Sequence, residues 1–148
     1  EYSKVVVMAT PMTLSQTKFN SMLHVYEDEA NIIKMPCPGL VEYIEGGMLE
    51  GPVLDEYLEK QFEPYEKSEI DAVVLGCTHY PFARKQIQQV LGENVKIFDG
   101  GEGTAREMKR RLQEKDLLCG RQKRGQVGFE NSLTDDSKIE LCKKLLNI

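Results

Sequence analysis

Four short runs of nearly continuous apolar residues mark the first hundred positions of the chain. Continuous apolar character, rather than strict alternation, is typical of strands covered on both faces. The stretches between these runs have helical periodicity, and strands that alternate with helices predict a mostly parallel sheet. The predicted fold class is therefore α/β, with a parallel sheet of about four strands flanked by helices. The runs are Lys4–Ala9, Asn31–Pro36, Asp71–Gly76 and Val95–Gly100.

Three stretches between the strands place apolar residues at the spacing of a helix face: Ser15–Glu29, Gly51–Lys67 and Phe82–Gly92. The last of these ends in a glycine suited to a helix C-cap. Methionine and aromatic residues of the first helices, Met22 and Tyr26 among them, have the spacing of core positions. We therefore expect each of these helices to cover the sheet.

After Gly103 the apolar strand runs give way to basic and turn-rich sequence, so we predict a domain over residues 3–103 and a separate segment over 104–148. Thr104–Leu118 reads as a basic amphipathic helix, and Val127–Ser132 as a short strand. A final helix should follow, forming with that strand a C-terminal strand/helix extension. The segment is too small to hold a core of its own. The candidate caps of the final helix are Asp135, Asp136 and Ser137.

Composition and charge narrow the classes of partner. The chain has 148 residues, 41% of them hydrophobic, which is enough for one α/β core. Its net charge of −5 predicts neither nucleic-acid nor membrane binding, although basic residues gather between Arg106 and Arg124. No apolar run approaches the ~20 residues of a membrane span, and the start lacks a secretory signal. A small molecule or a protein is the expected partner.

The four cysteines lie far apart in a chain that is not a small loop-rich scaffold, so free thiols are expected. Free thiols suit a reducing compartment, and the predicted location is cytoplasmic. Only two histidines occur and no two cysteines form a close pair, so no metal site is expected. The cysteines are Cys37, Cys77, Cys119 and Cys142.

The third strand runs into the sequence GCTHYP, where Cys77, Thr78 and His79 are consecutive. Ligands bind at the carboxyl ends of parallel strands, so this segment falls where a ligand would lie. A thiol, with an ordinary pKa of ~8.5, becomes reactive near neutral pH beside a helix N-terminus, a cation or hydrogen-bond donors. Pro81 suits the first turn of the helix that follows. The alternative is a cysteine that only packs, the commoner role of a thiol at a strand end.

The segment VVLGCTHYPF resembles the signature around the second catalytic cysteine of glutamate racemases, which interconvert L- and D-glutamate without a cofactor. VVVMATPMT resembles the strand and threonine turn that open that family's middle domain, and MPCPGLVEYIEGG resembles its Cys-Pro strand end and acidic-glycine segment. VKIFDGGEGTAREMKRRL and VGFENS are similar to its later strands and helix. The resemblance covers essentially the whole chain. Related aspartate racemases carry an acidic residue at the position of His79, so the hexapeptide favours the glutamate enzymes.

The resemblance implies a two-base reaction in which one thiolate removes the Cα proton of glutamate and a thiol on the opposite face returns one. Cys77 would be one of the two thiols, and His79 would assist its proton transfers. Thr78 and His79 would contact the substrate. Neither pyridoxal phosphate nor a metal is implied, and the D-glutamate formed would serve peptidoglycan synthesis and cell shape. The residues implied to lie around the substrate-contacting ones and to support them are Glu45, Thr10 and Thr13.

The family's fold consists of two similar α/β domains with the substrate between them, each contributing one cysteine. Nothing in this chain matches the first domain, with its cysteine and Asp-Ser turn. We therefore expect a carboxyl-terminal part of a racemase, inactive alone, whose residues 104–148 pack on the missing amino-terminal domain. A homodimer through the uncovered face is a further expectation.

The chain also departs from the family pattern at Met12, where glycine is usual, and at Gln16, where serine is usual. These differences leave room for a relative that acts on another amino acid or dicarboxylic acid. A non-catalytic anion-binding domain that keeps the strand end is the other alternative. Cys37 follows the second strand and is a candidate partner thiol by position, but the resemblance gives it no such role.

Overall fold

The computed structural model describes residues 3–121, 123, 125–132 and 136–146. The chain divides into two compact units, Glu1–Gly101 and Glu102–Ile148. The sequence places this division slightly later, after residue 103. The first unit carries the sheet and the GCTHYP segment, and the second carries two helices.

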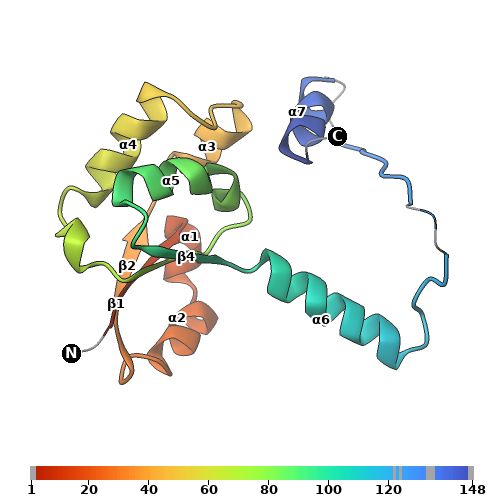
Figure 1. Cartoon of the computed structure of the whole chain (residues 1–148), viewed down its shortest axis with the longest axis horizontal. Coiled ribbons are helices and arrows are strands. Elements are labelled where there is room, and N and C mark those ends of the chain that lie inside the picture. Colours follow the sequence, from red (N-terminus) through yellow and green to blue (C-terminus); the bar gives the residue numbers. More distant parts are fainter. Residues whose placement is uncertain (1–2, 122, 124, 133–135, 147–148) are drawn as a thin grey trace. The chain divides into compact units, whose positions relative to one another are not determined.

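The first unit is built on a four-stranded sheet in the order β2-β1-β3-β4, with every neighbouring pair parallel (Figure 1). The four predicted strands are all present, and the parallel α/β prediction is confirmed. Because all strands point the same way, their carboxyl ends share one edge of the sheet. The strands are β1 (Ser3–Ala9), β2 (Ala30–Pro36), β3 (Ala72–Leu75) and β4 (Lys96–Asp99).

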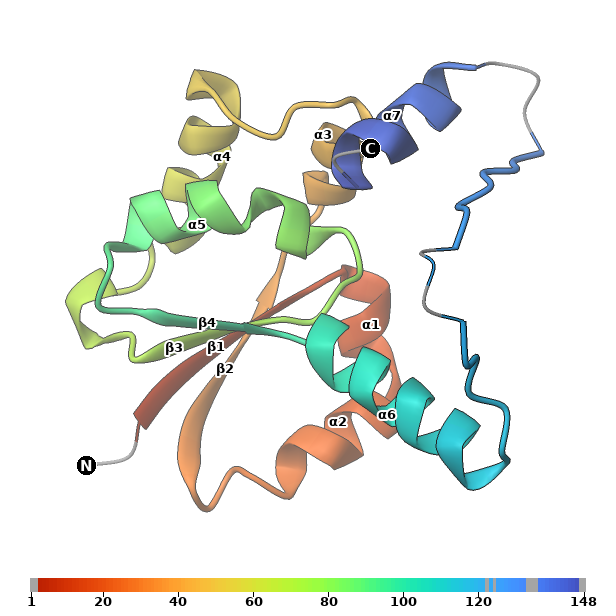
Figure 2. The same cartoon turned by 45° about the vertical axis from the view of Figure 1, so that its right-hand side comes forward.

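One face of the sheet is covered by three helices, α3 (Leu40–Glu45), α4 (Pro52–Phe62) and α5 (Arg84–Leu91), as Figure 2 shows. Their buried side chains form one cluster with the inward residues of the strands. Full burial of such side chains contributes ~1.5–3 kcal/mol each, so the packing of this layer stabilises the unit. Fully buried members include Leu40, Ile44, Leu54, Leu58, Phe62 and Ile87.

The helix predicted over Ser15–Glu29 is present but shorter, as α2 (Thr17–His24), and a further short helix that was not predicted, α1 (Pro11–Ser15), precedes it on the same face of the sheet, opposite to α3, α4 and α5 (Figure 2). The helix α1 begins after the N-cap Thr10 and ends at Gln16, whose extended backbone separates it from α2. Leu23 is buried, but Met22 and Tyr26 are 51% and 52% exposed. The core role predicted for those two side chains is therefore wrong.

Two further local features differ from the sequence reading. The helix α3 was not predicted, since it is only one to two turns long and begins after Gly39, whose φ of +86° is in the left-handed region. The predicted helix from Phe82 begins instead as a 3-10 turn, η2 (Tyr80–Ala83), and continues as α5. Its predicted C-cap is confirmed, because Gly92 has a φ of +84°.

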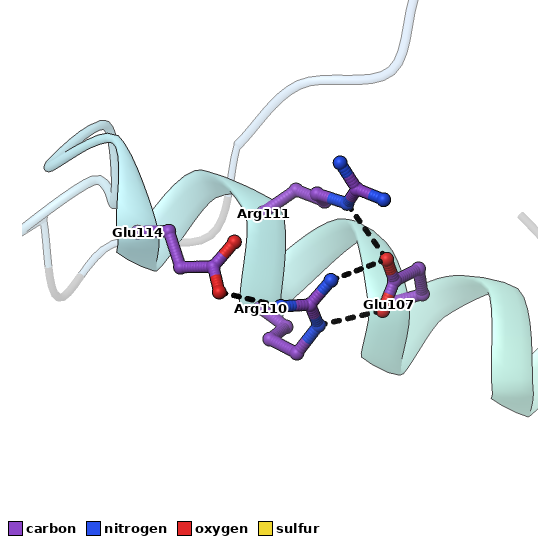
Figure 3. Close-up of polar contacts among 4 residues, drawn as sticks. All are labelled: Glu107, Arg110, Arg111 and Glu114. Atoms are coloured by element: carbon purple, nitrogen blue, oxygen red, sulfur yellow. Dashed lines mark hydrogen bonds and ion pairs between the residues drawn. The ribbon is translucent and has the colours of Figure 1, made fainter.

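The second unit contains α6 (Gly101–Glu114), which starts at the last residue of the first unit, and α7 (Ser137–Leu146). No described residue of either helix is buried. Charged side chains hold α6 locally, because Arg110 and Arg111 both donate to Glu107 and Arg110 also donates to Glu114 (Figure 3). The bonds that Arg110 and Arg111 donate to Glu107 lower the pKa of that carboxyl to about 2.

The strand predicted over Val127–Ser132 is wrong, since no described residue of that range is in a strand. A strand requires a pairing partner, and β1 to β4 pair only with one another among the described residues. The final helix begins at Ser137, directly after Asp136, which is one of the candidate caps. Asp135, another of those candidates, lies outside the described residues.

Candidate functional site

The carboxyl edge of the sheet gathers the chemistry of the first unit. Thr10 follows β1, Cys37 follows β2, Cys77 follows β3 after one glycine, and Asp99 ends β4. Main-chain hydrogen bonds extend the sheet past the strand ends, since Cys37 N donates to Ala9 O at 3.0 Å. The two thiols therefore emerge on either side of the central strand β1.

Gly76 allows the turn that carries Cys77 to lie directly against β1. Its N–H donates to the carbonyl oxygen of Met8 at 2.8 Å. A Cβ at this position would lie 3.0 Å from that oxygen and 3.3 Å from the Cβ of Ala9. Glycine is therefore required here for close approach, and not for an unusual backbone angle.

A thiol, an imidazole and a carboxylate line up at this edge. The sulfur of Cys77 lies 4.0 Å from Nδ1 of His79, and Nε2 of His79 lies 3.2 Å from Oε1 of Glu45. Cys77 is half-buried, and the His79 side chain is 33% exposed, so both groups are open to a ligand. Glu45 is the last residue of α3, so this short helix brings the carboxylate to the site.

The carboxylate determines what the imidazole can do. A carboxylate only accepts hydrogen bonds, so Nε2 of His79 must carry the proton that it donates to Glu45. In the neutral ring Nδ1 is then an acceptor that faces the sulfur of Cys77. This arrangement can take the thiol proton and stabilise the resulting thiolate beside an imidazolium.

The predicted supporting threonines, Thr10 and Thr13, bond to each other at the start of α1. Thr10 is the N-cap of α1, because its Oγ1 accepts from the N–H of Thr13 at 3.2 Å and lies 2.9 Å from Oγ1 of Thr13. This pair lies at the end of β1, the strand next to the one that carries Cys77. Thr78 is exposed beside Cys77, where a ligand could reach its hydroxyl.

Cys37 has a different environment from Cys77. It is 1% exposed, and its sulfur contacts the carbonyl oxygen of Met35 at 3.5 Å. Burial raises the pKa of the Cys37 thiol to about 12, and the nearby Cys77 adds to the rise. A thiol this weakly acidic remains protonated near neutral pH, so Cys37 is unsuited to be a base.

Tyr80 is a residue of this edge that the sequence analysis missed. It is fully buried, and its hydroxyl donates to the main-chain carbonyl of Cys37 at 3.2 Å. Burial also raises the pKa of its hydroxyl well above the ordinary value. The Tyr in GCTHYP was visible, but its partner lies 43 positions away and is a main-chain atom, so no local pattern indicated the contact.

Within residues 3–121, 123, 125–132 and 136–146, no three His, Cys, Asp or Glu side chains are grouped as they would be to hold a metal ion. None of the helices described has the length and apolar character needed to cross a membrane.

Fold and site together define a parallel α/β domain that presents a thiol and an imidazole at its ligand-binding edge, as expected for one domain of a thiol-dependent racemase. No family model matches the chain. The chain is 46% identical over 145 residues to a glutamate racemase of Clostridium acetobutylicum, covering 98% of this chain and 56% of that protein. It is 47% identical over 148 residues to one from Clostridium perfringens, covering 100% and 57%.

Solved structures agree with the sequence relatives. Glutamate racemase of Francisella tularensis, solved in complex with D-glutamate, superposes with a TM-score of 0.82 at 23% identity, over 100% of this chain and 55% of that one. A glutamate racemase isoform of Bacillus anthracis gives a TM-score of 0.76 at 26% identity, over 98% and 54%. Along its whole length the chain is therefore a homologue of the carboxyl-terminal part of glutamate racemases. It spans about half the length of the curated relatives it matches.

Proposed function

We propose that this chain is part of a glutamate racemase in which Cys77 is one of two thiols that exchange protons with the Cα atom of glutamate. The observation that carries the proposal is the line of Cys77, His79 and Glu45 at the carboxyl edge of the sheet. The similarity of the chain to glutamate racemases supports glutamate as the substrate. A Francisella relative was solved with D-glutamate and an Escherichia coli relative with L-glutamate.

In the proposed reaction the Cys77 thiolate removes the Cα proton of L-glutamate, so that a C–H bond breaks and an S–H bond forms. The electron pair stays on the substrate as a carbanion, and a second thiol on the opposite face donates a proton to Cα, which yields D-glutamate. In the reverse direction Cys77 donates the proton. No net oxidation occurs and no co-reactant is consumed.

His79 and Glu45 would control the protonation of Cys77. With Nε2 held on Glu45, Nδ1 of His79 can take the proton of Cys77 before Cys77 acts as a base. In the reverse direction, after Cys77 has donated its proton to Cα, the imidazolium can return a proton to the Cys77 thiolate that remains. The imidazolium formed would also attract the carboxylates of glutamate. The exposed hydroxyl of Thr78 would bind one of these carboxylates beside the sulfur.

The second thiol would come from the rest of the protein. Cys37 is buried, and its raised pKa opposes thiolate formation. Cys119 and Cys142 belong to the second unit, where both are exposed. We propose that the amino-terminal domain present in the relatives provides the other thiol and packs on residues 104–148. A homodimer and a cytoplasmic location that keeps these thiols reduced are further parts of this proposal.

Loss of the Cα proton of L-glutamate in D2O, followed by NMR, tests the proposal in the complete protein that contains this chain. The comparison is between the parent protein and its Cys77→Ala and Cys119→Ala variants. We expect exchange to be lost in Cys77→Ala by a factor of at least ~100, since general acid–base groups contribute about that much or more. The Cys119→Ala variant removes an exposed thiol of the second unit and should exchange at the parent rate.

Equal exchange in the parent and in Cys77→Ala would refute the role of Cys77. Absence of exchange in the parent would refute glutamate as the substrate, and other amino acids and dicarboxylic acids would then be tried. A binding titration with glutamate then identifies a non-catalytic binding domain, because such a domain would bind glutamate without exchanging its Cα proton.

A further inference from the structure

The hydroxyl of Tyr80 connects two strand ends that are not neighbours in the sheet. Tyr80 lies in η2, directly after the Cys77–His79 turn that follows β3, whereas its acceptor is the carbonyl of Cys37 after β2. The strand β1 lies between β2 and β3. The side chain therefore reaches over the end of β1.

Further main-chain bonds join this contact to the reacting thiol. Tyr80 N donates to the carbonyl oxygen of Cys77 at 3.3 Å, and Cys37 N donates to Ala9 O at 3.0 Å. The path from Cys77 through Tyr80 and Cys37 to β1 consists of hydrogen bonds at a buried edge. Such bonds are costly to leave unmade, because a buried carbonyl that loses its donor is not solvated by water.

We propose that Tyr80 is a positioning residue whose hydroxyl holds the Cys77–His79 turn against the end of β2 and so keeps Nδ1 of His79 facing the sulfur of Cys77. The proposal rests on the proposed function, in which Cys77 is the reacting thiol. His79 is the residue before Tyr80, and a change in the tilt of the Tyr80 ring moves the main chain that carries the imidazole. The titratable groups that face Cys77 are Cys37 after β2, His79, Tyr80 and, through His79, Glu45 of α3.

The alkylation rate of Cys77 by iodoacetamide, measured from pH 6 to 10.5 on its own peptide by mass spectrometry, is a direct test that requires no turnover. The background variant carries Cys119→Ser and Cys142→Ser, which removes both exposed thiols. In this background Tyr80→Phe deletes only the hydroxyl. We expect its rate at pH 7 to fall about three- to tenfold, the range for loss of one hydrogen bond. Its rate at pH 10.5, where a thiol of ordinary pKa is ionised with or without the imidazole, should not change.

Tyr57→Phe is the matched control. The Tyr57 hydroxyl also donates to a main-chain carbonyl, that of Pro38 at 3.0 Å, one residue beyond Cys37. Tyr57 belongs to α4, however, and has no main-chain bond to the thiol turn. We expect the Tyr57→Phe chain to keep the parent ratio of neutral to alkaline rate, and 4-aminophenylalanine at position 80, which keeps a donor, to restore it.

A neutral-to-alkaline ratio that is unchanged in Tyr80→Phe, or that falls equally in Tyr57→Phe, overturns the proposal. A rise of the rate at every pH overturns it as well, because it reports simple exposure of the thiol. If Tyr80→Phe does not fold, 4-fluorophenylalanine, which fills the space of the hydroxyl but cannot donate, takes its place. Failure of the proposed function is distinguishable, because the complete protein would then fail to exchange the Cα proton while the alkylation ratios still differ.

Discussion

Substitution of Gly76 by alanine tests the close approach of the thiol turn to β1. The added Cβ would lie 3.0 Å from the carbonyl oxygen of Met8 and 3.3 Å from the Cβ of Ala9. The oxygen cannot move aside freely, because it accepts the Gly76 N–H at 2.8 Å. The end of β3 must therefore shift by a few tenths of an ångström and weaken that bond. Overpacking of this kind costs ~1–3 kcal/mol in the free energy of unfolding.

Tyrosine fluorescence during urea unfolding measures this loss in the first unit alone, because all six tyrosines precede residue 102 and the chain has no tryptophan. With a typical denaturant slope, the midpoint of Gly76→Ala should fall by roughly 1 M urea. Gly103→Ala is the control, since an added Cβ at Gly103 meets no atom within 4 Å. A midpoint for Gly76→Ala within ~0.2 M of the parent would refute the close contact.

Two further predictions concern charged groups. Hydrogen bonds from Arg84 Nη2 and from the Gly101 N–H lower the pKa of Asp99, so the stability that this carboxylate contributes is complete above about pH 4 and is lost as the pH falls through the lowered pKa. Arg84→Met should cost about 1 kcal/mol at pH 7 and less at pH 3 by the same urea assay, and an equal loss in Lys85→Met would contradict this. Bonds from Arg110 lower the pKa of Glu107 to about 2, so their support of α6 is complete above the ordinary carboxyl range and lost toward pH 2. Glu107→Gln should speed amide exchange in α6 at pH 5, and no change, or a difference that 1 M salt leaves intact, would refute the role of these charges.

The strands of the first unit were predictable because each contains a short, nearly continuous apolar run, although the edge strands β2 and β4 leave residues such as Lys34 and Phe98 exposed. The short helices were not. Six residues of α3 are too few to show a helical period, and the split between α1 and α2 depends on the extended backbone of Gln16, which has no strong local preference. The strand expected at Val127–Ser132 was wrong for a different reason. Apolar character can suggest a strand, but it cannot provide the neighbouring strand to which the main chain must bond.

The candidate site divides in the same way between local and distant information. Cys77 and His79 are two positions apart, so their proximity follows from the turn itself. Glu45 lies 34 positions from His79, and only the resemblance to the racemases pointed to it. The Tyr80 contact with Cys37 could not be predicted, because one of its partners is a carbonyl that every residue carries.

Cys37 and Cys77 are the same residue type in different environments, and the environment decides which of them suits the proposed proton transfer. Both follow strands that pair with β1, and they lie close enough for the charge of one to raise the pKa of the other. Cys37 is enclosed, with its sulfur on a carbonyl oxygen, and burial together with the nearby Cys77 opposes its ionisation. Cys77 is half-buried and faces an imidazole that a carboxylate orients. A two-base reaction at this edge can therefore use Cys77 but not Cys37, and the proposed racemase needs its second thiol from a domain that approaches the substrate from the opposite side.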